Sequence, residues 1–74
     1  MKKVDKILTE QVILDVSIFL LKHGDSFPVF SLSNSTFKED ERVKILFNVA
    51  EEHGYKILSE PDKKEGYTKL TCST

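Results

Sequence analysis

The sequence predicts an α+β domain, with two α-helices packed on one face of a three-stranded antiparallel sheet in the order helix, strand, helix, strand, strand. Three patterns lead to this prediction. Apolar residues recur at helical spacing in two segments, β-forming residues cluster in three others, and an isolated glycine follows each helical segment. Because a chain of 74 residues can hold one core, we expect residues 1–74 to form a single small domain.

The first helix is expected from Val4 to His23, and it is unusually apolar. One sector of its helical wheel holds Leu8, Val12, Val16, Phe19 and Leu20, and a second sector holds Leu14, Ile18 and Leu21. A helix that is apolar on more than one side must be covered on more than one side. This pattern therefore predicts a homodimer or a protein partner. Gly24, directly after His23, is typical of a helix end in the left-handed conformation.

The second helix is expected to begin near Phe37, because Thr36 and Glu39 have the spacing of a capping box. It should end at His53 and Gly54, as the first helix ends at its own histidine and glycine. Its apolar stripe consists of Val43, Leu46, Phe47 and Ala50.

Three segments are expected to be strands. Phe27–Ser33 is rich in β-formers, and Pro28 is tolerated at the start of a strand or on a sheet edge. Tyr55–Glu60 and Tyr67–Cys72 flank the turn at Pro61–Gly66 and read as a hairpin.

The strands suggest a sheet that is apolar on both faces. Ile57 and Leu58 are neighbours and therefore point to opposite faces, and Phe27 with Val29 should oppose Phe30 with Leu32. Helices cover one face, so the other would need a second subunit or a partner. The predicted interface consists of Leu14, Ile18, Leu21, Phe27, Val29, Tyr55, Ile57 and Tyr67.

The sequence offers no pattern typical of catalysis, of a metal site or of a cofactor site, so we expect no enzyme, no metal and no cofactor. His23 and His53 each precede a helix-ending glycine, where a polar ring suits a helix C-terminus. Cys72 is a single cysteine and is interpreted as a small buried hydrophobe. The glycines are isolated, so none forms a phosphate-binding loop.

Charge and hydropathy limit the partners further. The formal net charge is −1, from 11 Lys and Arg against 12 Asp and Glu, so no strong field attracts nucleic acid or anionic lipid. No run approaches the roughly 20 apolar residues that a membrane span needs. A lone cysteine and the absence of a secretory signal pattern favour the cytoplasm. We expect no membrane partner and infer no small-molecule substrate.

Two resemblances suggest an alternative function. From Phe27 onward, the order of elements resembles the Arg-x-x-x-His family of single-stranded nucleic-acid binders, through Phe27-Pro28, Ser35, Val49-Ala50, Gly54 and Ser59. The family's His slot holds Phe47 and its Arg slot holds Val43, so its functional pair is not carried over; Arg42 is one residue out of register.

The hairpin from Lys56 to Thr71 is also similar to the wing of winged-helix modules. Either resemblance implies nucleic-acid binding. The alternative prediction is therefore a single-stranded nucleic-acid-binding module, with Lys56, Lys63, Lys64 and Lys69 at the backbone and Tyr55 or Tyr67 stacking on bases.

The favoured prediction is a non-enzymatic protein-interaction module that self-associates and acts as an accessory or inhibitor protein. The style of the sequence also suggests a small phage or prophage protein.

Overall fold

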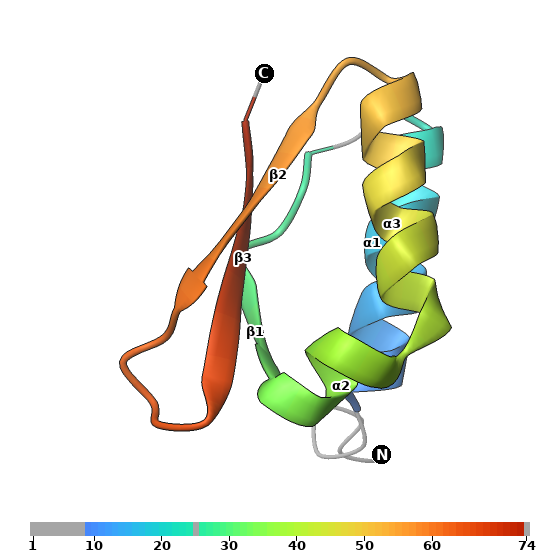
Figure 1. Cartoon of the computed structure of the whole chain (residues 1–74). Helices are drawn as coiled ribbons and strands as arrows, with labels where there is room; N and C mark the ends of the chain where they lie inside the picture. Colours follow the sequence, from blue (N-terminus) through green and yellow to red (C-terminus); the bar gives the residue numbers. More distant parts are fainter. Residues whose placement is uncertain (1–8, 25, 74) are drawn as a thin grey trace, which may run out of the picture.

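The computed structural model describes residues 9–24 and 26–73, which form a helical layer packed against a sheet (Figure 1). In chain order the elements are α1 (Glu10–Lys22), β1 (Phe30–Ser33), α2 (Asn34–Glu39), α3 (Glu41–Glu52), β2 (Lys56–Pro61) and β3 (Tyr67–Ser73). The long helices α1 and α3 lie side by side on one face of the antiparallel sheet, which confirms the predicted α+β fold. The predicted second helix is divided into α2 and α3.

Both ends of α1 are set by local signals. Thr9 is the N-cap, and its hydroxyl accepts a hydrogen bond from the N–H of Val12 at 3.3 Å. His23 is the C-cap, and Gly24 follows with a φ of +78°, a conformation that a side chain would strain. The predicted C-terminal end is therefore confirmed. The predicted stretch from Val4 to Leu8 lies outside the described residues.

The capping box predicted at Thr36 and Glu39 is wrong. The N-cap of α2 is Ser33, whose hydroxyl accepts a hydrogen bond from the N–H of Thr36 at 3.2 Å. Asp40 then leaves the helical conformation, with φ −77° and ψ 122°, and caps α3 by accepting from the N–H of Arg42 at 2.9 Å. Because Asp40 is not helical, the chain changes direction between α2 and α3.

The later boundaries agree with the prediction. Helix α3 ends at His53, and Gly54 follows with a φ of +82°. Strands β2 and β3 form the predicted hairpin, and β3 lies in the middle of the sheet, in the order β1-β3-β2. Leu70 of β3 lies opposite Ser59 of β2 and Phe30 of β1, so these three residues share the inner face, which the helices cover.

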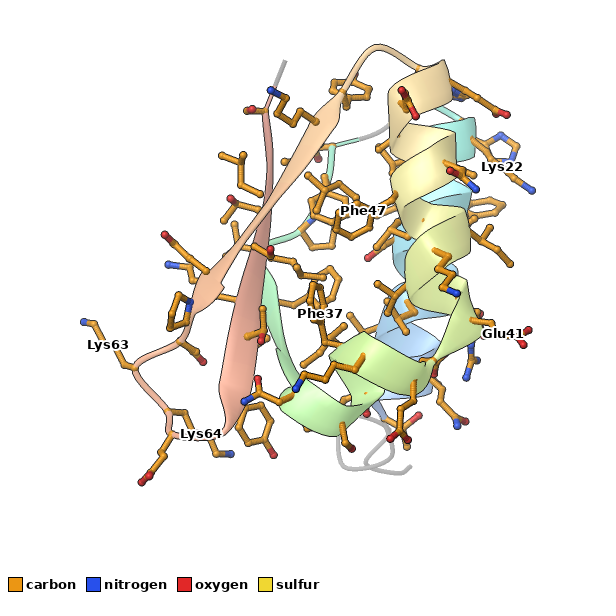
Figure 2. All side chains as sticks on the ribbon, in the orientation of Figure 1. Lys22, Phe37, Glu41, Phe47, Lys63 and Lys64 are labelled. Carbon is orange, nitrogen blue, oxygen red and sulfur yellow. The ribbon has the colours of Figure 1, made fainter. Side chains whose placement is uncertain are left out.

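The hydrophobic core lies between the helices and the inner face of the sheet. It consists of Leu14, Leu21, Leu32, Val43, Leu46, Val49, Ala50, Ile57 and Leu70. Phe37 of α2 and Phe47 of α3 pack against it with their rings edge to face, 6.4 Å between centroids. Figure 2 shows both rings pointing from the helices toward the sheet.

Candidate interaction surface

The outer face of α1, defined here as Val12, Val16 and Phe19, is apolar and exposed. These side chains are 37%, 45% and 57% exposed. Spacings of four and three residues place them on one stripe of a helix about 20 Å long. At the C-terminal end of the stripe, the ring of Phe19 lies against that of His23, with 4.2 Å between centroids. Single exposed apolar residues are ordinary, but a contiguous row is typical of a binding surface.

A hollow adjoins this stripe and extends the apolar surface toward the sheet. Its volume is about 220 Å³, and it is lined by Val12, Ile13 and Val16 of α1 together with Pro28 and Phe30. Every lining residue is apolar, so the hollow suits an apolar side chain and offers no partner to a polar ligand.

Charged side chains border the stripe on the side of α1 that faces α3. Asp15 and Lys22 are both exposed. Asp15 lies 3.4 Å from a guanidinium nitrogen of Arg42, whose other terminal nitrogen lies 3.0 Å from Asp40. Hydrogen bonds from the side chain and N–H of Arg42 hold the pKa of Asp40 below its usual value. Figure 2 shows Lys22 on the side of the helical layer away from the sheet.

The structure reverses the two sectors that the sequence assigned to α1. Leu14 and Leu21 are 0% and 1% exposed inside the core of the single chain, and Ile18 is half-buried against it. A partner cannot reach Leu14 or Leu21 in this arrangement. The excess apolar surface of the helix is present, but it belongs to the sector of Val12, Val16 and Phe19.

The other predicted interface residues are dispersed. Ile57 is a core residue, and Phe27 and Tyr55 are half-buried against the core. Val29 is 62% exposed and lies just before β1. Tyr67 is half-buried on β3, and the ammonium of Lys64 lies 4.3 Å from the centroid of its ring.

The outer face of the sheet, turned away from the helices, is mainly polar. Phe27 packs beside Phe30, with 5.5 Å between ring centroids, because β1 begins only at Phe30 and the preceding residues do not follow strand alternation. Leu58 does point outward and is 46% exposed. In the strand register, Thr71 lies opposite Leu58, and the rest of the outer face carries the side chains of Ser31, Ser33, Lys56, Glu60, Tyr67 and Lys69. The predicted second apolar face is therefore wrong.

The four lysines of the nucleic-acid alternative do not form one basic surface. Lys56 and Lys69 lie on the outer face of the sheet, and Glu60 lies directly opposite Lys69 in the strand register. Lys63 and Lys64 project from the hairpin turn (Figure 2). Tyr55 packs on the opposite side of the sheet from Tyr67, so the two rings cannot stack on one strand of bases.

A larger hollow of about 540 Å³ lies beside the hairpin turn, lined in part by Phe37, Lys38, Pro61, Asp62 and Thr68. Two of the polar side chains that line it, Asp62 and Thr68, already have hydrogen-bond partners within the chain. The carboxylate of Asp62 accepts hydrogen bonds from the hydroxyl of Ser31 at 2.6 Å and the N–H of Lys63 at 2.8 Å. The hydroxyl of Thr68 donates to Asn34 at 2.7 Å. These hydrogen bonds hold the hairpin turn against β1 and the start of α2.

Reactive groups are not gathered in the described part of the chain. Within residues 9–24 and 26–73, no three His, Cys, Asp or Glu side chains lie together in a way that could hold a metal ion. Burial raises the pKa of the Cys72 thiol, which keeps the thiol protonated and weakly nucleophilic.

Sequence reasoning missed the role of Glu10. Its carboxylate, in the first turn of α1, accepts hydrogen bonds from the N–H of Ser33 at 2.5 Å and from the hydroxyl of Thr36 at 2.7 Å. In a capping box, a carboxylate within the same helix accepts from the N-cap N–H. Here a different helix supplies that carboxylate. The contact fixes the start of α2 against α1, and no local spacing could have revealed it.

Comparison of the chain with protein-family models, with curated proteins and with solved structures finds no match in any of the three. The described residues include no helix with the length and apolar character needed to cross a membrane. The function is therefore inferred from the surface itself.

Proposed function

We propose that this domain is a non-enzymatic protein-interaction module that self-associates through the outer face of α1 and acts as an accessory or inhibitor protein. A cytoplasmic location is part of the proposal, because the chain has one cysteine and a small secreted domain would rely on several disulfides.

One observation carries the proposal: Val12, Val16 and Phe19 form an exposed apolar row that continues into an apolar hollow. Each residue keeps more than a third of its surface in water, and covering such area contributes about 25 cal/mol per Å². A large aromatic side chain such as Phe19 suits the centre of an interface.

Single-stranded nucleic-acid binding has less support. Affinity for such ligands comes from a basic groove with stacking aromatics. The lysines here are divided between the sheet and the turn, Glu60 lies opposite Lys69, and Lys64 already covers Tyr67.

The test compares two matched charge insertions. Val16→Glu and Leu58→Glu replace apolar residues of nearly equal exposure, 45% and 46%, on α1 and on the outer face of the sheet. Light scattering coupled to size-exclusion chromatography, over a micromolar concentration series, reports the mass. We expect the wild type and Leu58→Glu to associate, and Val16→Glu to be a folded monomer by circular dichroism.

Other results would overturn the proposal, place the interface elsewhere or favour the alternative function. A wild type that stays monomeric throughout, or a Val16→Glu variant that associates as the wild type does, would overturn the proposal. Loss of association in Leu58→Glu alone would show that the interface lies on the outer face of the sheet. Salt-dependent binding of short oligonucleotides would favour the nucleic-acid alternative.

A further inference from the structure

We infer that the occupant of the outer face of α1 is a second copy of this chain, docked antiparallel about a twofold axis, with Asp15 of each copy facing Lys22 of the other. This inference rests on the proposed self-association and adds its geometry. It follows from the unequal flanks of the stripe.

The stripe has the pattern of a coiled-coil seam. Val12, Val16, Phe19 and His23 follow one another at spacings of four, three and four residues, as the a and d positions of a heptad do. The side chains on the two flanks then have different chemistry. Asp15 and Lys22 occupy one flank, seven residues apart, and Ile13 and Leu20 occupy the other, also seven residues apart.

Contacts within the single chain confirm which way each flank faces. Asp15 lies on the side of α3, where its carboxylate meets Arg42 at 3.4 Å. Ile13 lies on the side of Pro28 and Phe30, where it lines the apolar hollow. Asp15 and Lys22 remain exposed, whereas Ile13 and Leu20 are half-buried.

Each flank contacts a different part of the partner in the two possible twofold arrangements, parallel and antiparallel. In a parallel pair, each flank meets the opposite flank of the partner, so Asp15 and Lys22 would lie against apolar Ile13 and Leu20 and lose water without compensation. In an antiparallel pair, each flank meets its own copy. Charge then lies against charge, and apolar surface against apolar surface.

The signs of the charges select the antiparallel pair as well. With the axis midway between Val16 and Phe19, Asp15 and the partner's Lys22 are displaced by about 3 Å along the helix, within reach of a flexible lysine side chain. The two copies of Asp15 are displaced by more than twice that distance. Two symmetric pairs of opposite charge therefore form, and like charges stay apart.

The experiment uses charge reversal in the full chain. Asp15→Lys makes the flank wholly positive, and Lys22→Glu makes it wholly negative. The dimer of each variant alone is expected to have a dissociation constant at least about tenfold higher than that of the wild type, because two attractive pairs become repulsive in the symmetric dimer. An equimolar mixture of the two variants is expected to associate with nearly wild-type affinity, since every flank contact is then between opposite charges.

Sedimentation equilibrium gives these dissociation constants, and Lys44→Glu, an exposed reversal on α3 beside Phe47, is the matched control that should leave them unchanged. Circular dichroism melting of each variant shows that it is folded. If the wild type dimerises but neither the single variants nor their mixture differ from it, the antiparallel pairing is wrong and the proposed function stands. If the wild type is monomeric at all concentrations, both fail.

Discussion

Replacement of Glu10 is the sharpest test of how the two helical segments are joined. The carboxylate of Glu10 accepts from the N–H of Ser33 and from the hydroxyls of Thr36 and Ser33, at 2.5, 2.7 and 3.3 Å. In Glu10→Ala these donors lose their acceptor, and the start of α2 loses its contact with α1. Glu10→Gln preserves the size of the side chain and one carbonyl oxygen but removes the negative charge.

The size of the effect follows from the bonds that are lost. A hydrogen bond to a charged group contributes about 1.5–3 kcal/mol, and bonds that share one carboxylate are not additive. We therefore expect Glu10→Ala to lower the free energy of unfolding by about 2–4 kcal/mol. In a domain of this size the corresponding fall in Tm is at least about 8 °C. Glu10→Gln should lose less than half as much.

The effect should also depend on pH. Burial raises the pKa of Glu10, but hydrogen bonds from Thr36 and Ser33 outweigh it and hold that pKa below its ordinary value of 4.5. A carboxyl with a depressed pKa in the folded state stabilises the fold above its unfolded pKa, and this stabilisation is lost as pH falls through the folded pKa. The gap in stability between wild type and Glu10→Gln should therefore be complete above pH 4.5 and should shrink in more acidic solution.

Thermal and urea unfolding, followed by circular dichroism at several pH values between 7 and about 2.5, measure both quantities. A loss in Glu10→Ala below about 0.5 kcal/mol, as for an ordinary surface substitution, would show that the contact has no structural role. A gap between wild type and Glu10→Gln that stays constant or grows on acidification would refute the assigned protonation.

Three further predictions concern the core and the caps. Leu46→Ala, at a fully buried position, should lower the free energy of unfolding by about 3–5 kcal/mol, as measured in urea. Phe47→Ala, at a half-buried position, should lower it clearly less, and equal losses would contradict the assigned burial. Ser17→Ala should leave thermal stability equal or raise it by up to about 2 kcal/mol, because the buried hydroxyl of Ser17 has no hydrogen-bond partner; a lower Tm would mean that the hydroxyl is bonded. Asp40→Ala should cost about 1 kcal/mol through loss of the α3 cap, as measured by its Tm, and Asp40→Asn should recover part of that loss.

The sequence by itself determined the fold class and the order of the elements, apart from the division of the second helix into α2 and α3, and it determined most of their ends. Gly24 and Gly54 ended the helices where predicted, because each adopts a positive φ that strains other residues. The hairpin also followed from its local pattern. Such signals act over a few residues, so they can be read without knowing what packs against them.

Tertiary structure alone decided which sector of α1 is buried and which residue completes the cap of α2. Both sectors of α1 are apolar, and helical periodicity separates them without saying which one faces the sheet. The packing of α1 against α3 and β1 encloses Leu14 and Leu21 and leaves Val12, Val16 and Phe19 in water. The cap of α2 depends likewise on Glu10, which is distant in sequence and is brought near only because the helices pack on one sheet.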